Sequence, residues 1–573
     1  SDLRENDLFG IGAVDALVHD VKFCGDEEIS VAFQGHLTNK REILAAEGIP
    51  VERGAESGII KHLYVQYGQN INQKLKGKYC FALWDARSRR MLLSADRYGY
   101  GCLYYYQDEH WCVFATEIKA ILKVLDHTPE PNINGICDIY NFHTVYGNDT
   151  PFQNIYLLPY GSFAELWGHG MQLKRYWEYP MYQQHEERIE EELLELTKEK
   201  MLDSVRNAIQ DHEHVGIMIT SGLDSRWIAG AVDKLFPDKN TFLYHINNGR
   251  EDLSAIKNMS RVLGMPLILR GDEKKDLTEK ALAEYVHLTD GHWAPYEFMA
   301  GIQELRKQYD DVVLFNGYLC DVSFQPSILR SYYTSKSSDM LKTTLECFSF
   351  LPDYLSDGIF TNGFAAKLRR RKSERIEETL LLFSKADPVF QALRFYNINR
   401  GRRHVYFWMK AINCYVKLAT PGTDYDLYDF AMKIPRQFRE NAKFYIASIV
   451  QLFPELGDIV WNKTGKPLRL GSMKKSKAAQ KFVPLMKYAL QRLTHGKIDL
   501  SNPPSSFDRL FRQNKVFRDQ VCALLLDEKA TGRGFYNRAG FERLISLQLS
   551  GRDYGGLFES MITVECLFRR FFD

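Results

Sequence analysis

The sequence predicts an α/β protein of two domains, a sheet-rich domain followed by a parallel-sheet domain with a helical extension. Its 573 residues are more than one hydrophobic core usually organises. From residue 29 to about 173, short apolar or alternating runs are separated by Gly, Asp and Asn turns. Beyond residue 188, compact apolar runs alternate with helical periodicity, which is typical of a parallel sheet covered by helices. We therefore place the domains at residues 1–180 and 188–573.

The first domain is predicted to contain strands at residues 29–33, 79–84, 90–94, 103–106 and 112–115, with few helices between them. Residues 178–187 are polar, and apolar side chains then recur at helical spacing from Ile189 onward. This change in pattern sets the domain boundary.

The second domain is predicted to contain strands at residues 215–219, 241–246, 267–269 and 312–315, with helices from residue 226 and through 255–263. From about residue 331 to 573 the pattern is mainly helical. A basic run at residues 367–372 is interpreted as a solvated helix face.

Composition narrows the class of protein. The chain is 45% hydrophobic and 26% charged, as folded proteins are, and its net charge of +1 gives no overall field for a polyanion. Neither nucleic acid nor membrane is indicated as a partner. Ten cysteines without a CxxC pair argue against a zinc site and a disulfide framework. No apolar run is long enough to span a bilayer, and the first residues do not resemble a signal peptide. We expect a cytoplasmic protein.

The most informative stretch joins the apolar run at 215–219 to the helix from 226. It consists of Thr220, Ser221, Gly222, Leu223, Asp224 and Ser225. The glycine allows close backbone approach to an anion, and a helix N-terminus supplies unpaired N–H donors, so phosphate is the expected ligand. A carboxylate among phosphate donors implies a cation such as Mg²⁺. The alternative is an ordinary helix start capped by Asp224 or Ser225.

The stretch lacks a Gly-Lys-Ser/Thr ending, and it resembles instead the Ser-Gly-Gly-x-Asp-Ser loop of the ATP-pyrophosphatase fold, from which Thr220 and Ser221 depart. Residues 34–39, 75–85, 96–105 and 115–122 look like the glutaminase-type domain of asparagine synthetases. The chain thus resembles the asparagine synthetase superfamily, which includes β-lactam synthetases and lasso peptide cyclases. The resemblance implies an αββα N-terminal-nucleophile-like sandwich, degenerate as a glutamine amidotransferase, followed by an ATP-pyrophosphatase (PP-loop) synthetase domain.

The resemblance also implies further site residues. Residues 312–321 are similar to the family's strand and Ser-Gly-Glu-Gly-x-Asp loop, which makes Asn316 and Gly317 nucleotide-binding residues and Asp321 a second metal ligand. Strands of one parallel sheet would place Asp224 and Asp321 beside one crevice, where one Mg²⁺ could bridge both.

Two lysines are carried over in the same way. Lys443, after the Pro-Gly-Thr-Asp motif at 421–424, is expected to contact phosphate, and Lys463, in the segment 461–466, is expected to be catalytic. For both, an ordinary surface lysine is the alternative.

The chain also departs from the family. Members that use glutamine begin with a cysteine and carry His-Arg-Gly-Pro-Asp, whereas this chain begins Ser1-Asp2-Leu3, lacks that pentapeptide and has Gln34 in place of an oxyanion-stabilising Asn. We expect no glutaminase activity. Tyr318 stands where asparagine synthetases have Glu and β-lactam synthetases a catalytic Tyr with a distant glutamate partner. Simple packing is the alternative for Tyr318.

The function that follows is an AMP- and pyrophosphate-forming amide ligase that uses ATP and Mg²⁺. It would adenylate the carboxylate of a small molecule or peptide for attack by an amine, within one substrate (β-lactam or macrolactam type) or between two. The alternatives are ammonia-dependent amidation of a small acid and a nucleotide-binding, non-catalytic descendant. A tRNA-modifying ATP-pyrophosphatase is disfavoured by the neutral charge. A homodimer or a processing-enzyme partner stays open.

Overall fold

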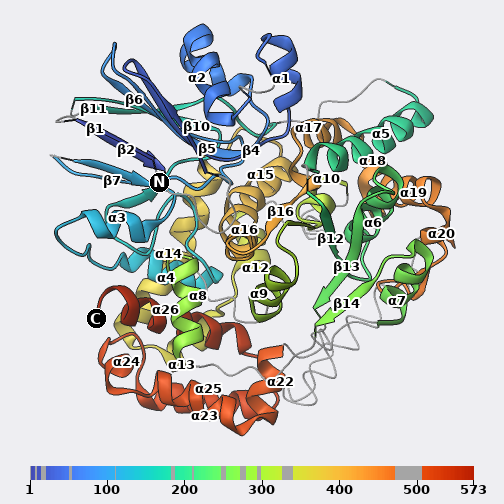
Figure 1. Ribbon diagram of the computed structural model, residues 1–573. Helices are drawn as coiled ribbons and strands as arrows, with labels where there is room; N and C mark the ends of the chain where they lie inside the picture. The colour runs from blue at the N-terminus through green and yellow to red at the C-terminus, as the bar shows by residue number, and fades with distance from the viewer. Residues whose placement is uncertain are drawn as a thin grey trace.

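The computed structural model describes residues 2–6, 9–13, 21–50, 54–109, 111–168, 170–181, 188–209, 212–246, 253–270, 279–292, 299–324, 340–470 and 506–573. Antiparallel sheets lie in the N-terminal part, and a parallel sheet with many helices lies in the rest (Figure 1). The predicted α/β class is confirmed. Among the described residues, no helix combines the length and the apolar character that crossing a membrane requires.

A six-stranded antiparallel sheet in the order β11-β10-β6-β5-β4-β3 dominates the first domain. Its strands are β3 (Val21–Gly25), β4 (Ile29–Leu37), β5 (Gly77–Asp85), β6 (Arg90–Ala95), β10 (Ser162–Trp167) and β11 (Gly170–Arg175). Helices α1 (Lys40–Ala46) and α2 (Glu56–Tyr67), followed by the 3₁₀ turn η2 (Gly68–Gln73), lie over one face.

Alternation along β5 shows how the layers stack. Tyr79, Phe81 and Leu83 are buried in the core beneath α2, whereas Cys80 and Ala82 are buried in a separate core on the opposite face. Successive side chains of a strand point to opposite faces, so both faces of this sheet are covered.

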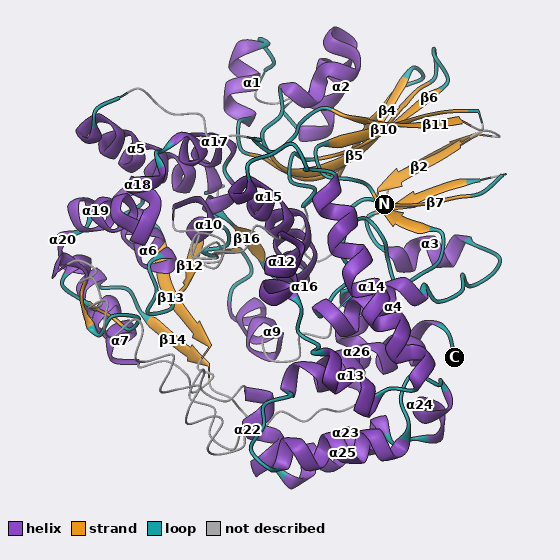
Figure 2. Cartoon of the chain, turned by 180° about the vertical axis from the view of Figure 1, so that it is seen from behind, coloured by secondary structure: helices purple, strands orange, loops and turns teal. Residues whose placement is uncertain are grey.

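The second core joins the large sheet to a further layer of strands and helices. This layer contains β1 (Asp2–Asn6) paired with β2 (Phe9–Ala13), and the sheet β8 (Cys112–Ala115), β7 (Tyr104–Gln107) and β9 (Ile155–Leu157). Helices α3 (Ile118–Val124) and α4 (Ile133–Phe142) pack beyond it (Figure 2). The order helix, sheet, sheet, helix is the expected αββα sandwich.

The parallel sheet has the order β14-β13-β12-β15-β16. Its strands are β12 (His214–Met218), β13 (Asn240–Ile246), β14 (Leu267–Arg270), β15 (Val312–Phe315) and β16 (Lys417–Ala419), and the first four were predicted. The chain adds β13 and β14 on one side of β12 and then crosses to add β15 on the other. The switch point of this topology therefore lies between β12 and β15, where open α/β sheets bind ligands.

Helices make up most of the remaining chain, as predicted for the described part of residues 331–573. Those around the parallel sheet are α5 (Glu190–Ala208), α6 (Asp224–Leu235), α7 (Leu253–Leu263), α8 (Glu279–Leu288), α9 (Met299–Gln308) and α10 (Cys320–Phe324). The extension contains α12 (Met340–Phe348), α13 (Asp353–Ile359), α14 (Asn362–Leu381), α15 (Pro388–Phe395), the π-helix η4 (Tyr396–Val405) and α16 (Tyr406–Asn413).

Shorter elements follow β16. They are η5 (Pro421–Thr423), α17 (Tyr425–Lys433), α18 (Arg436–Arg439), η6 (Glu440–Ala442), α19 (Lys443–Leu452), α20 (Pro454–Gly457), the hairpin strands β17 (Val460–Trp461) and β18 (Lys466–Pro467), and η7 (Leu468–Leu470). The C-terminal helices are α22 (Ser506–Gln513), α23 (Lys515–Leu525), α24 (Glu528–Gly532), α25 (Arg538–Leu549) and α26 (Gly555–Phe571).

The interpretation of the basic run at 367–372 as a solvated face is wrong for one side of α14. Arg371 and Lys372 are buried, and Arg371 lies 3.3 Å from Asp138. One turn later, Arg375 Nε donates to Asp138 Oδ2 at 2.8 Å. A fully buried carboxylate requires paired cations, so part of this charge run belongs to the core.

Polar contacts join the two parts of the chain. Arg97 pairs with Asp429 at 2.7 Å, and Lys76 pairs with Asp426 at the same distance. The proposed boundary between domains is not decided by the structure, because residues 182–187 lie outside the described residues.

Candidate active site

The predicted phosphate loop leaves the end of β12 and enters α6 directly. Ser225 Oγ accepts from Thr220 N at 2.9 Å and donates to Thr220 O at 3.2 Å, and Thr220 Oγ1 accepts from Gly222 N at 3.2 Å. The N-cap of α6 is Leu223, and no side chain caps it. The alternative in which Asp224 or Ser225 is an ordinary cap is therefore wrong. The hydroxyls of Thr220 and Ser225 hold the loop in shape instead.

Two carboxyl groups meet beside this loop. Asp224 opens α6 after β12, and Asp321 lies in α10 after the neighbouring β15. Burial, together with repulsion from Asp321, raises the pKa of Asp224, and burial also raises the pKa of Asp321. The positive charge of Lys463 offsets part of the increase in each pKa. The structure thus brings together three of the residues singled out in the sequence.

Gly317 determines how closely β15 approaches the loop. A Cβ on Gly317 would lie 2.5 Å from Asp224 Cβ, which no real side chain tolerates. Next to it, Asn316 Oδ1 accepts from Tyr318 N at 2.9 Å, and Asn316 N donates to Ala419 O at the same distance. Gly317 therefore lies directly against Asp224, and Asn316 is held beside it by its hydrogen bonds to Tyr318 and Ala419.

Tyr445 is a site residue that the sequence did not reveal. Its hydroxyl donates to Asp224 Oδ1 at 2.6 Å, and its ring stacks on Phe324 at 5.2 Å between centroids. Lys443, two positions earlier in α19, is half exposed and lies 2.5 Å from Glu190 Oε1. Side chains two positions apart in a helix are separated by roughly 200° around the helix axis, so they point to nearly opposite sides. The rotation of α19 therefore directs Tyr445 to the aspartates and Lys443 to Glu190.

Lys463 reaches the site from the turn of the β17–β18 hairpin. Its ammonium lies 5.5 Å from the centre of the Trp461 ring, and the Trp461 carbonyl accepts from the amides of Thr464 and Gly465 at 2.9 and 2.8 Å. The side chain of Lys463 is exposed. An exposed ammonium on a short turn can approach a ligand that binds at the aspartates.

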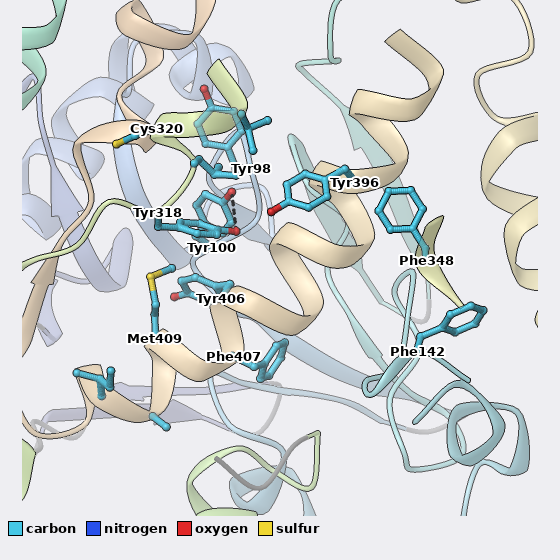
Figure 3. Close-up of a cluster of buried hydrophobic side chains, with 14 of the residues drawn as sticks. Tyr98, Tyr100, Phe142, Tyr318, Cys320, Phe348, Tyr396, Tyr406, Phe407 and Met409 are labelled. Carbon is cyan, nitrogen blue, oxygen red and sulfur yellow. Dashed lines mark hydrogen bonds between the residues drawn. The ribbon is translucent and has the colours of Figure 1, made fainter. Parts of the chain in front are cut away.

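Tyr318 lies in a cluster of buried aromatic side chains (Figure 3). It is buried, and its hydroxyl donates to the Tyr100 hydroxyl at 3.3 Å. Tyr100 belongs to the first domain and stacks on Tyr406 at 4.9 Å. Burial raises the pKa of Tyr318. The hydroxyl's partner is thus a tyrosine, where the resemblance would have suggested a glutamate.

The residues at the crevice fit a magnesium-bound nucleotide. Among the residues that the structure describes, no group of three or more His, Cys, Asp or Glu side chains could hold a metal ion alone. Two desolvated carboxylates that repel each other would be stabilised by a divalent cation, and Mg²⁺ typically takes one or two carboxylates plus phosphate oxygens. Asp224 and Asp321 are such a pair, and the uncapped start of α6 is where phosphates would lie.

A separate cavity of about 80 Å³ lies between the two domains. Its first-domain lining includes His36 and Lys78, and its second-domain lining includes Lys417 and Asp424. None of the residues at the carboxyl pair lines it. The cavity and the Asp224–Asp321 site are therefore separate places in the fold.

Comparison with known proteins agrees with this architecture. Residues 23–177 match the glutamine amidotransferase domain family. The chain is 27% identical over 218 residues to asparagine synthetase [glutamine-hydrolyzing] 2 of Bacillus subtilis, covering 36% of this chain and 29% of that protein. It is 22% identical over 245 residues to asparagine synthetase [glutamine-hydrolyzing] 1 of the same organism, covering 42% and 38%.

A fungal relative carries a different name. The amidase chyE of Penicillium rubens is 28% identical over 242 residues, covering 39% of this chain and 35% of that protein. The chain thus spans well under half the length of these curated relatives. A solved glutamine phosphoribosylpyrophosphate amidotransferase from B. subtilis matches with 15% identity over 53% of this chain and 59% of that one, at a TM-score of 0.20, which is too low to support an argument.

In this α/β fold, a sandwich that matches the glutamine amidotransferase domain family is joined to a parallel sheet with two carboxyl groups at its switch point. Over part of its length the chain is similar to asparagine synthetases, and residues 23–177 match the glutamine amidotransferase domain family.

Proposed function

We propose that this protein is an ATP-dependent amide ligase that forms AMP and pyrophosphate. The observation that carries the proposal is the pair Asp224 and Asp321 at the two strand ends that flank the switch point of the parallel sheet. Two desolvated carboxyl groups placed close together have no structural benefit, whereas a cation bound with nucleotide phosphates would stabilise both.

In the first step, a substrate carboxylate oxygen attacks the α-phosphorus of ATP and the bond to the β-phosphate oxygen breaks. The amides at the start of α6 bind phosphate oxygens, and Asp224 and Asp321 hold Mg²⁺, which neutralises phosphate charge. Tyr445 holds the Asp224 carboxylate through its hydrogen bond. Lys463 lies close enough to both aspartates to interact with the same phosphates. Lys443 could contact phosphate only if its side chain left Glu190.

In the second step, an amine attacks the acyl carbon, the bond to AMP breaks and the amine loses one proton. Lys463 stabilises the oxyanion that develops on the acyl oxygen. The proton passes to the phosphate of the departing AMP or to water, because the Tyr318 hydroxyl keeps its own proton and donates it to Tyr100. Tyr318 would then help to shape the site rather than act as the base. Because the adenylate is already reactive, positioning and the exclusion of water account for most of the catalysis.

We propose that the amine does not come from glutamine. Gln34 replaces the asparagine of glutamine-using relatives, and the sequence contains no His-Arg-Gly-Pro-Asp. An amine carried by the substrate, as in β-lactam or macrolactam closure, is then the favoured nucleophile. Ammonia-dependent amidation of a small acid is the second candidate, and it rests on the asparagine synthetases among the relatives.

The test combines binding and turnover. Calorimetry should detect ATP binding that requires Mg²⁺. Incubation of the protein with ATP, Mg²⁺ and the small-molecule and peptide fraction of its source cells should yield AMP and pyrophosphate in equal amounts, together with a product one water lighter than its precursor. Added glutamine should not be hydrolysed.

Two variants on the same helix sharpen this test. Asp224→Asn should abolish AMP formation, whereas Asp233→Asn, on the exposed side of α6, should retain it. ATP binding without any AMP would indicate a non-catalytic descendant. Formation of ADP, or the absence of ATP binding, would contradict the proposal.

A further inference from the structure

Arg226 is a buried cation that has no carboxylate among its hydrogen-bond partners in the described part of the chain. It is the third residue of α6, and none of its surface is exposed. Its guanidinium donates only to backbone carbonyls: Nη1 to Leu456 and Ile459 at 3.0 and 2.8 Å, and Nη2 to Ser221 and Val460 at 3.3 and 3.0 Å. A charged group is placed in a core at considerable cost, so a guanidinium held by four backbone carbonyls calls for an explanation.

The four carbonyls come from two segments of the chain. Ser221 belongs to the phosphate loop. Leu456 in α20, Ile459 and Val460, the first residue of β17, belong to the segment that forms the β17–β18 hairpin, whose turn carries Lys463. Asp224 and Lys463 therefore stand on two segments that meet at one guanidinium. A planar fork with fixed donor directions sets the distance between the segments it joins, which a flexible ammonium would not do.

Packing on the next turn of α6 reinforces this junction. Gly230 faces the segment just before the hairpin, and a Cβ there would lie 2.7 Å from Phe453 Cγ and 2.9 Å from Leu456 Cδ1. The helix thus approaches residues 453–456 as closely as a glycine allows. The helix that begins at the phosphate loop and the segment that ends in the Lys463 hairpin form one rigid contact.

We propose that Arg226 is a positioning residue that couples the phosphate loop to the Lys463 hairpin, so that a nucleotide held by the loop fixes the lysine over it. The coupling to nucleotide rests on the proposed function, whereas the mechanical link between the two segments does not. Arg226 acts through Ser221, Ile459 and Val460 and touches no reacting atom.

Hydrogen–deuterium exchange on the full chain tests the link without any substrate. In Arg226→Lys, a single ammonium would have to take the place of a guanidinium that donates to four carbonyls. Amide exchange at residues 459–466 should therefore rise about tenfold in the absence of nucleotide. Exchange in β5 and β6 should not change. Arg403→Lys is the matched control, because Arg403 is also buried and donates to carbonyls, those of Val145 and Asp149 at 2.9 and 2.6 Å, far from the hairpin in sequence. This control should leave residues 459–466 as in the wild type.

A second variant keeps the test decisive if Arg226→Lys does not fold. Gly230→Ala leaves the guanidinium intact but displaces residues 453–456, and it should raise exchange in the same hairpin. Hairpin exchange equal to the wild type in a folded variant, or an equal rise in every peptide, would overturn the proposal.

Addition of ATP and Mg²⁺ tests the coupling. In the wild type, both the phosphate loop and the hairpin should become protected from exchange. In Arg226→Lys the loop should still be protected, but the hairpin should gain less protection than it does in the wild type. Equal hairpin protection in both proteins would disprove coupling through Arg226. If the wild type shows no protection at all, the proposed nucleotide function fails, while the exchange measured without nucleotide still decides the mechanical link.

Discussion

Asp224 is the residue at which the demands of ligand binding and of stability conflict most clearly. It shares a desolvated crevice with Asp321, and both carboxyl groups have raised pKa values because ionisation is unfavourable there. A raised carboxyl pKa means that stability is lost as pH rises from the ordinary value toward the raised one. Near neutral pH the pair therefore lowers the stability of the free protein, as is common at binding sites.

Asp224→Asn should consequently raise the stability of the nucleotide-free protein. The substitution removes the repulsion, while an amide oxygen can still accept from Tyr445, and we expect a gain on the order of 1 kcal/mol at pH 7.5. Thermal unfolding without nucleotide measures it. Asp233→Asn should change stability by less than about 0.5 kcal/mol. A lower melting temperature for Asp224→Asn would show that the carboxylate is already compensated.

At the scale of elements, the regular parts of both sheets could be predicted because their strands are apolar runs bounded by turn residues. Residues 112–115 and 312–315 form β8 and β15 as predicted. Strands β3, β9, β10, β11 and β16 were not predicted; β9 and β16 have only three residues, too few to show a periodicity. The helices α1 to α4 were missed because most are short.

The candidate site, too, could be predicted from the sequence only in part. Asp224 and Asp321 could be brought together from sequence because each follows a strand of one parallel sheet. The orientation of Lys443 and the presence of Tyr445 could not be predicted, because both depend on how α19 rotates as it packs. Motif spacing carries no information about that rotation.

The approach of β15 to α6 depends on Gly317. Gly317→Ala should push Asp224 away from Asp321, since the new methyl would lie 2.5 Å from Asp224 Cβ, and it should weaken Mg²⁺-dependent ATP binding about tenfold or more. Calorimetry measures this change. Gly363→Ala, in open space on α14, should leave ATP affinity unchanged and raise stability by about 0.5–1 kcal/mol. Wild-type affinity in Gly317→Ala would place the nucleotide elsewhere.

At the scale of the whole molecule, the first domain is connected to the helical extension by buried polar contacts as well as by packing. Arg402 donates to Gly99 O at 3.1 Å and to Leu158 O, and His143 Nδ1 lies 2.9 Å from Ser560 Oγ, between α4 and α26. These contacts join the first domain to the helical extension. The protein is therefore expected to unfold as one cooperative unit.

Acid should destabilise this unit through His143. Burial, with a smaller contribution from Arg400, lowers the pKa of His143 to about 3. Because the unfolded chain takes up a proton near pH 6.5 and the folded one does not, stability is complete above pH 6.5 and is lost as pH falls toward 3, by up to about 1.4 kcal/mol per pH unit. His143→Asn, whose side chain tolerates the residue's φ of 63°, should flatten this slope in urea unfolding between pH 4 and 7. An unchanged slope would assign the proton uptake to another group.

The two ion pairs across the domain contact should differ in strength. Arg97 is largely buried, pairs with Asp429 and lies 4.7 and 4.2 Å from the ring centres of Trp177 and Tyr425. Arg97→Ala should cost about 1–3 kcal/mol. Lys76→Ala, which breaks a pair more than one third exposed, should cost less than about 1 kcal/mol. Denaturant titration compares them, and equal losses would mean that packing around Arg97 contributes nothing.

The position of α26 has a consequence for biosynthesis. Ser560 and His143 are 417 residues apart in the chain, and Phe152 lies 5.2 and 5.1 Å from the rings of Phe571 and Phe572. At a translation rate of about 5–20 residues per second, an interval on the order of tens of seconds separates the two halves of this contact. During that interval α4 has been synthesised but the apolar side that packs against α26 is uncovered, and chaperones bind surfaces of this kind. Ribosome-stalled chains that lack residues 555–573 should accordingly be cleaved near α4 by protease, and resistance there would mean that α4 needs no such cover.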